Sequence, residues 1–325
     1  MLSVAPITHL SAEQAAAWHA VVVAALATDL PDEPLPTLQQ VHARLTASGL
    51  DSRRLAWLGT APDGAVIGVA GLRLFTSPGQ EHLAELELHV HPEHRRSGLA
   101  SRLLSAARLA AKAEHRRSLI TGAADGGPGD AFCAARGFRR VLTLNHLLLD
   151  VARADDTAAD AAHPGYELTS WVGTVPDELA DAFVAAKNAM NDMPTGDLDY
   201  GNQDWTADRV RAMAQVLADR GDTLLTTAAL RGGEMAGYTE VVIRAGETRR
   251  AAQYDTAVVP AHRGHGLGLW LKAAMVRGLR AWHPDVREIE TDNAQDNTHM
   301  LAVNQRLGYR THRRTHEYQL DLTSD

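Results

Sequence analysis

Two short stretches of the sequence combine a strand-like run, an arginine and closely spaced glycines, and both could bind an anion. Residues 90–100 read VHPEHRRSGLA and residues 258–268 read VVPAHRGHGLG. In each, Arg-x-x-Gly-x-Ala/Gly leads into apolar residues at helical spacing. Backbone N–H groups at a helix start have no partner inside the helix and carry the positive end of its dipole, and glycine lets a ligand come close. Each stretch therefore predicts an anion site suited to a pyrophosphate.

A glycine-rich helix start that binds nothing is the alternative, and other phosphate-binding motifs also use glycines at this place. Neither copy contains the Gly-x-x-x-x-Gly-Lys of a P-loop. The spacing of a dinucleotide site is also absent, because Gly264-x-Gly266-x-Gly268 is followed by Trp270 and Leu271. The sequence thus favours a pyrophosphate site of a different type.

The two stretches belong to an internal repeat. Val, Pro, His, Arg, Gly and Leu recur at a constant offset of 168 residues, and Gly137-Phe138 matches Gly308-Tyr309 at an offset of 171. Self-similarity over half the chain predicts two copies of one fold. We expect one domain over residues 1–152, a linker rich in Ala and Asp over 153–165, and a second domain over 166–325.

Each copy shows the same order of predicted elements, with a hairpin-rich front and a strand–helix–strand back. This pattern predicts an α/β fold in which a central mixed sheet is flanked by helices. Ser11 with Gln14 predicts the start of the first helix. In the first copy we expect helices after Ser11, after Thr37, over 97–115 and near Ala131, and strands over 55–58, 66–75, 83–90, 118–121 and 141–149. In the second copy we expect helices over 177–190 and 207–220, from Gly266 onwards and over 297–307, and strands over 223–230, 235–243, 251–259, 288–291 and 315–322.

Composition excludes several classes of protein. The 325 residues carry a formal net charge of −8 with a pI near 6.0, which argues against a protein that tracks nucleic-acid phosphates. Cys133 is the only cysteine, so the chain can form no internal disulfide. No apolar run is long enough for a membrane span and no signal peptide precedes the first predicted helix. We therefore expect a cytoplasmic protein, monomeric or homodimeric, with no nucleic-acid or membrane partner.

The motifs resemble those of a known family. The run Val-x-Pro-x-x-Arg-x-x-Gly-x-Gly/Ala before a long helix looks like motif A of the GNAT N-acetyltransferase superfamily. Asn293, Asn297, Met300, Asn304 and the run Leu307-Gly308-Tyr309 look like its motif B. The resemblance covers both halves of the chain. This tandem arrangement is similar to that of mycothiol synthases and related actinobacterial acetyltransferases, but it does not imply the substrate of mycothiol synthase. It implies a sheet that splays between its fourth and fifth strands, where the pantetheine arm of acetyl-CoA lies.

The resemblance also implies the residues that bind acetyl-CoA, with no metal. The expected cofactor-binding residues are Val258, Val259, Arg263, Gly264, His265, Gly266, Leu267, Gly268, Asn293, Asn297 and Asn304 in the second half, and Arg95, Arg96, Gly98 and Ala100 in the first. The family's usual acid for the departing thiolate is a Tyr four residues before the last motif's Gly. Cys133 and Asn304 stand there instead.

Direct transfer to an amine needs a base, and the resemblance places it on the fourth strand beside the splay. Asp255 is the candidate there, with Glu87 at the matching position of the first half and Glu85 on the same strand face. A solvated carboxylate at a strand end is the equal alternative. Tyr254 could serve as an acid or simply pack.

An acidic loop and several histidines are further candidates. The loop Met193–Tyr200 with Asp192, Asp197 and Asp199 could attract a cationic acceptor, although most acidic loops are only solvated.

The histidine pairs 91/94 and 312/316 lack a completing carboxylate or Cys in the sequence pattern, so we expect no metal site.

The function predicted from these observations is an acetyl-CoA-dependent N-acetyltransferase that acts on a small amine, an amino sugar or a peptide amine. A non-catalytic acyl-CoA-binding sensor or interaction scaffold is the alternative, and transfer of another acyl group is a third. Only the second half follows its turn with Asn293, Asn297 and Asn304, whereas the first has Gly126-Gly127-Pro128-Gly129-Asp130. We therefore expect the second half to carry the chemistry.

Overall fold

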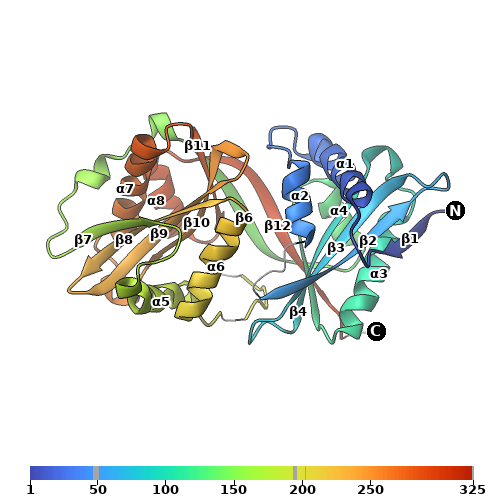
Figure 1. The fold of residues 1–325 in the computed structure, drawn as a ribbon, viewed down its shortest axis with the longest axis horizontal. Helices are drawn as coiled ribbons and strands as arrows, with labels where there is room; N and C mark the ends of the chain where they lie inside the picture. The colour runs from blue at the N-terminus through green and yellow to red at the C-terminus, as the bar shows by residue number, and fades with distance from the viewer. Residues whose placement is uncertain (47–50, 193–195, 202, 324–325) are drawn as a thin grey trace. The chain divides into compact units, whose positions relative to one another are not determined.

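The computed structural model describes residues 1–46, 51–192, 196–201 and 203–323 (Figure 1). The first half of the chain forms β1 (Ser3–Pro6), α1 (Ala12–Asp29), α2 (Leu38–Thr46), β2 (Ser52–Thr60), β3 (Val66–Phe75), β4 (Leu83–Val90), α3 (Leu99–Ala113), β5 (Ser118–Ala124), α4 (Pro128–Ala135) and β6 (Arg139–Asp150). The second half forms β7 (Glu167–Val172), α5 (Ala180–Asn188), α6 (Ala207–Asp219), β8 (Thr223–Arg231), β9 (Glu234–Arg244), β10 (Glu247–Val258), α7 (Leu267–Trp282), β11 (Glu288–Ala294), α8 (Thr298–Leu307) and β12 (Arg310–Asp321). The mixed α/β fold confirms the predicted fold class.

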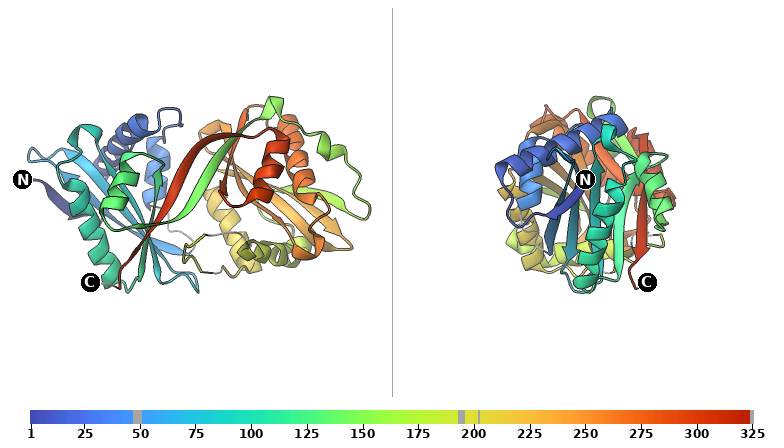
Figure 2. Two further views of the ribbon diagram at one scale, coloured as in Figure 1. Left: turned by 180° about the vertical axis from the view of Figure 1, so that it is seen from behind. Right: turned by 90° about the vertical axis from the view of Figure 1, so that its right-hand side faces the viewer.

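The chain divides into two compact units that differ from the sequential segments 1–152 and 166–325. The first unit comprises Met1–Leu142, Asp197–Gly201 and Thr315–Asp325, and the second comprises Thr143–Gly196 and Asn202–Arg314. The cause is an exchange of last strands. β12 pairs antiparallel with β5 of the first unit, from Asp321 opposite Ser118 onwards. β6 pairs antiparallel with β11 of the second unit, from Asp150 opposite Glu288 onwards. Figure 2 lets β12 be followed in red and β6 in green.

Within the second unit the strands follow the order β6-β11-β10-β9-β8-β7, and helices cover both faces of the sheet. Successive strand residues point to opposite faces, so β8 and β9 contribute side chains to two hydrophobic cores, one on each face of the sheet. Ala228 and Tyr238 pack with Phe183 of α5 and Val210 of α6, whereas Ala229 packs with the start of α7. β9 is buried along nearly its whole length, as expected for a strand covered on both sides.

The first unit repeats this arrangement with the order β1-β2-β3-β4-β5-β12. Val69 packs with Trp18 of α1, whereas its neighbour Ala70 packs in the core that contains Leu103 of α3. Ser11 caps α1 and forms the predicted capping box with Gln14, which confirms that helix start. Among the described residues, no helix is both long and apolar enough to cross a bilayer.

The fourth and fifth strands of each unit part after a short parallel contact. β4 pairs with β5 only from Leu83 to Glu85, although β4 continues to Val90. β10 pairs with β11 only from Arg250 to Ala252, although β10 continues to Val258. The sheet of each unit therefore splays at the strand ends that lead into α3 and α7.

Candidate functional site

The turn between β10 and α7 has the backbone path of an open anion cradle. After Val258 the chain makes a 3₁₀ turn at Pro260–His262, and both Gly264 and Gly266 adopt left-handed φ angles, +82° and +76°. α7 then begins at Leu267. The left-handed region is costly for residues with a Cβ, so this path favours glycine.

The first unit has the same path at the matching positions. Arg96 and Gly98 adopt φ angles of +61° and +85°, and α3 begins at Leu99. Arg96 is thus a non-glycine residue held in a costly conformation, at the position that Gly264 fills in the second unit. The two turns share their geometry, and the second forms it with less backbone strain.

The arginine of the motif folds back onto its own strand in both units. Arg263 Nε donates to Val258 O at 3.2 Å, and Arg95 Nε donates to Val90 O at 3.3 Å. Arg95 also forms a two-pronged ion pair with Asp29 of α1, with both N–O distances 2.8 Å. In both units, the arginine therefore stabilises the turn by a hydrogen bond to its own strand. In the first unit, the ion pair with Asp29 also ties the arginine to α1.

The cradle leaves space for a ligand. A Cβ placed on Gly264 or on Gly98 would meet no atom of the described residues within 4 Å. A Cβ on Gly268 would lie 3.9 Å from Val258 Cγ2, and one on Gly266 would lie 3.5 Å from His163 Cε1. The start of α7, a 16-residue helix, therefore has open space in which an anion could approach its free N–H groups.

His163 of the linker and Tyr166, just after it, border the second cradle, a feature that no sequence pattern indicated. The His163 ring packs on Trp270 of α7 with centroids 4.4 Å apart. Tyr166 Oη and His262 Nδ1 lie 3.2 Å apart, and the Tyr166 ring packs beside His265. Imidazoles thus lie around the start of α7, where an anionic ligand would come.

Asn293 and Asn304 meet beside the splay. Asn293 lies on β11 beyond its last pairing with β10, and Asn304 Nδ2 donates to Asn293 Oδ1 at 2.6 Å. Asn304 is fully buried, and its Oδ1 has no hydrogen-bond partner among the described residues. Asn297 instead caps α8, because its Oδ1 accepts from Met300 N at 3.2 Å. Of the three, Asn293 lies beside the splay, Asn304 is buried behind it, and Asn297 serves the helix start.

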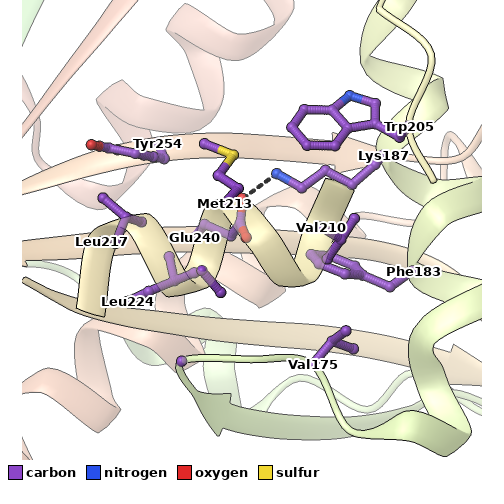
Figure 3. A pocket seen from close by; sticks show the side chains of 12 residues that line it. Val175, Phe183, Lys187, Trp205, Val210, Met213, Leu217, Leu224, Glu240 and Tyr254 are labelled. Carbon is purple, nitrogen blue, oxygen red and sulfur yellow. Dashed lines mark hydrogen bonds and ion pairs between the residues drawn. The ribbon is translucent and has the colours of Figure 1, made fainter. Parts of the chain in front are cut away.

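Asp255 lies on β10 as expected, and it belongs to a buried ion-pair group that the sequence did not reveal. Lys187 Nζ of α5 donates to Glu240 Oε2 at 2.5 Å and to Asp255 Oδ2 at 2.7 Å. Tyr238 Oη donates to the same Asp255 oxygen at 3.4 Å. The Lys187 ammonium also lies within 5.5 Å of the ring centroids of Phe183, Trp205 and Tyr238. Figure 3 shows Lys187 pointing at Glu240, with Trp205 beside it.

Charge pairing sets the protonation of this group. Burial lowers the pKa of Lys187, but the charges of Asp255 and Glu240 outweigh it and raise the pKa overall. Burial raises the pKa of Glu240 against the opposing charge of Lys187. Lys187 therefore stays an ammonium. Tyr254 lines the pocket next to this group and is partly exposed, and burial raises its pKa, so its hydroxyl stays protonated.

The matching carboxylate of the first unit is Glu87. His89 Nε2 and Arg44 Nη2 each lie 3.3 Å from a Glu87 oxygen. Burial acts to raise the pKa of Glu87, but the hydrogen bond from His89 and the charge of Arg44 bring it to about 2. Glu85 pairs with Arg73 at 3.3 Å.

The acidic loop is divided between the units. Asp197 and Asp199 belong to the first unit, where Asp197 pairs with Arg139 at 3.1 Å and Asp199 with His82 at 3.3 Å. Asp192 ends a 3₁₀ turn after α5, and residues 193–195 lie outside the described residues. Asp197 and Asp199 thus already have partners in a different unit from Asp255.

Two side-chain groups have metal-like spacing, contrary to the expectation that no carboxylate accompanies the histidines. Glu93 accompanies His91 and His94, and Asp125 and Asp130 accompany His316, with ligand atoms within 4.8 Å of one another in each group. Asp130 already accepts from Gly126 N at 2.9 Å and from Tyr318 Oη. The absence of a metal requirement stays a prediction.

Comparisons with known proteins agree with this geometry. A family model described as the acetyltransferase (GNAT) family matches twice, over residues 21–138 and 188–309. A tandem GNAT protein from the clavulanic acid biosynthesis pathway, solved without acetyl-CoA, is 27% identical with a TM-score of 0.81, and the match covers 99% of both chains. A GCN5-related N-acetyltransferase from Sphaerobacter thermophilus is 18% identical with a TM-score of 0.70, over 98% of this chain and 96% of that one, which shows the fold. A search of curated proteins gives no match. The chain belongs to the acetyltransferase (GNAT) family, in its tandem form, and is an acetyl-CoA-dependent N-acetyltransferase.

Proposed function

We propose that the second unit transfers the acetyl group of acetyl-CoA directly to the amine of a small molecule, an amino sugar or a peptide. One observation carries this proposal. β10 bears Asp255 along its length and ends in the open cradle of Gly264 and Gly266, beside the splay that Asn293 lines. The candidate cofactor site and the candidate proton acceptor thus share one strand of one unit, which supports the proposal.

The chain's own groups divide the work of binding. The free N–H groups at the start of α7 bind the pyrophosphate. Asn304 holds the Asn293 carbonyl oxygen, so the Asn293 amide N–H₂ is directed away from Asn304 and can donate to the pantetheine arm. When bound, acetyl-CoA supplies the thioester carbonyl that the acceptor amine attacks.

Asp255 takes the proton from the acceptor amine, directly or through a water. Its side chain is 32% exposed, so the carboxylate is reachable while Lys187 holds it from inside. The single ammonium of Lys187 cannot neutralise both Glu240 and Asp255. The exposed side of the Asp255 carboxylate would attract a cationic amine.

A non-catalytic acyl-CoA sensor is the second candidate, and one observation favours it. Lys187 Nζ lies 2.7 Å from Asp255 Oδ2, so an ammonium of the protein itself already occupies one hydrogen-bonding site of the proposed base. Asn304 and Cys133 also lack the acidic hydroxyl of the Tyr that the family usually has there.

Two measurements decide between the candidates. Titration calorimetry with CoA tests binding, and release of free thiol from acetyl-CoA across a panel of primary amines, amino sugars and peptides tests transfer. We expect binding in the absence of metal, and thiol release with at least one class of amine. Binding without thiol release from any amine would favour the sensor, and no binding at millimolar CoA would contradict both.

A further inference from the structure

Three buried positions that are apolar in the first unit are polar in the second. The repeat offsets of 168 and 171 residues match them pairwise, along the helix that starts at the cradle and across the last motif. The exposed fractions are at most 6% at all six positions. The pairs are Leu104 and Lys272, Cys133 and Asn304, and Phe138 and Tyr309.

The three polar side chains at these positions of the second unit lack some of the hydrogen bonds that they could form. Lys272 makes no hydrogen bond or ion pair within the described part of the chain, and its Nζ lies 5.1 Å from the centroid of the Tyr309 ring. Tyr309 Oη and Asn304 Oδ1 are buried without a partner among the same residues. Such groups destabilise a fold unless something absent from the protein alone completes them. The first unit shows that the same positions can be filled by apolar side chains.

Lys272 lies close to the cradle. It follows Gly268 by four residues along α7, which is about 6 Å at the helical rise of roughly 1.5 Å per residue. In a poorly solvated core, a negative charge about 10 Å away would raise the pKa of an amine by roughly one unit. A pyrophosphate at the start of α7 would therefore act on Lys272.

No other charge competes for this amine. Burial lowers the pKa of Lys272 to about 7, and it is the sole cause of the shift. Among the described residues of the elements packed against α7, Tyr309 presents the titratable group that contacts Lys272, and burial keeps its hydroxyl protonated. Arg277 and Arg280 of the same helix are paired with Asp156 and Asp160 of the linker.

We propose that Lys272 is an internal counter-ion for the cofactor of the second unit, and that it takes up a proton when CoA binds at the start of α7. This inference rests on the proposed binding of CoA there. The amine gains one proton from solvent and becomes an ammonium. Asn304 Oδ1 and Tyr309 Oη lie in the same unit without hydrogen-bond partners among the described residues, and both atoms can accept a hydrogen bond. Lys272 acts through charge without touching the cofactor, so it is a positioning residue.

The test counts protons. CoA is titrated into the wild type and into Lys272→Leu at pH 8, in two buffers with different ionisation enthalpies. For one to two negative charges on the pyrophosphate, the wild type should take up about 0.4 to 0.8 proton per CoA more than Lys272→Leu, and should bind CoA about twofold to tenfold more tightly. The difference in uptake should vanish near pH 6, where Lys272 is already protonated. Histidines near the cradle are common to both proteins and cancel in the difference.

Controls separate this role from packing. Lys272→Leu installs the residue of the first unit and should unfold at a higher temperature than the wild type, and Lys272→Met keeps the chain length if Leu disturbs the core. Leu104→Met, the matched change in the first unit, should leave the uptake at the wild-type value. Equal uptake and equal affinity in wild type and Lys272→Leu would overturn the inference. No CoA binding by either protein would instead show that the proposed function has failed, and the inference with it.

Discussion

Lys187 Nζ lies 2.7 Å from Asp255 Oδ2, so the carboxylate proposed as the base is tied to a buried ammonium. The Lys187 side chain is 3% exposed and that of Asp255 is 32% exposed. One side of Asp255 is therefore fixed by the protein and the other faces solvent. An ion pair of this kind fixes the orientation of the carboxylate.

Asp255→Asn should lower transfer about 100-fold at neutral pH, the lower end of what a positioned base contributes. Activity should recover partly at alkaline pH, because more of the acceptor amine is then already neutral. The Lys187–Glu240 pair remains, so the variant should fold. The measurement is thiol release from pH 6 to 10, with CoA affinity as the control. Wild-type turnover over that whole range would remove Asp255 from the mechanism.

Lys187→Met should destabilise the protein by about 3–5 kcal/mol, because it leaves the buried Glu240 and the partly exposed Asp255 without their cation. Adding Glu240→Gln to Lys187→Met should restore part of this loss, since one of the two carboxylates is then neutral. Urea unfolding of the wild type, both single variants and the double variant gives the coupling energy. If the losses of unfolding free energy in the two single variants simply add in the double variant, Lys187 and Glu240 are not coupled, which would contradict the ion pair.

Two carboxylates should make the protein sensitive to acid. Glu290 contacts Arg313 at 2.7 Å and His146 at 3.4 Å. Burial acts to raise its pKa, but His146 and Arg313 bring the pKa to about 2, as His89 and Arg44 do for Glu87. A pKa depressed on folding stabilises the protein above the unfolded value of about 4.5. This stabilisation is lost as pH falls towards 2.

Each of these two groups should contribute up to about 3 kcal/mol at neutral pH, less whatever solvent screens. We expect the melting temperature of the wild type to fall steeply below pH 4.5. Glu290→Gln and Glu87→Gln should each lower it at pH 7 and flatten that fall. A melting temperature in Glu290→Gln with the same pH dependence as the wild type would contradict the assignment for the second unit.

The sequence predicted local features well and long-range pairing poorly. The capping box at Ser11, the order of helices and strands, and the turn before α7 all follow from short-range patterns, and the structure contains them. β1 and β7 were not predicted, because they are short and mostly exposed and lack a clear alternation.

The exchange of β6 and β12 could not be read from the sequence either. Alternation shows which side of a strand is buried, but it does not specify which neighbouring edge the strand pairs with. The Lys187–Asp255 contact joins residues 68 positions apart, and the approach of His163 to Gly266 depends on how the linker packs. Neither leaves a periodic signal.

Replacing one glycine in each cradle tests whether the second unit carries the transfer. Gly266 and Gly98 occupy matching left-handed positions, so Asp strains both backbones alike. Gly266→Asp places a carboxylate against the pyrophosphate, which at about 4 Å costs about 4 kcal/mol, or roughly a 100- to 1,000-fold loss of transfer. Gly266→Asn and Gly98→Asn control for side-chain size without the charge, and circular dichroism checks folding. We expect Gly266→Asp to lose acetyl transfer while Gly266→Asn keeps more of it, and Gly98→Asp to keep most activity. Equal losses from the two Asp variants, or loss only from Gly98→Asp, would contradict this expectation.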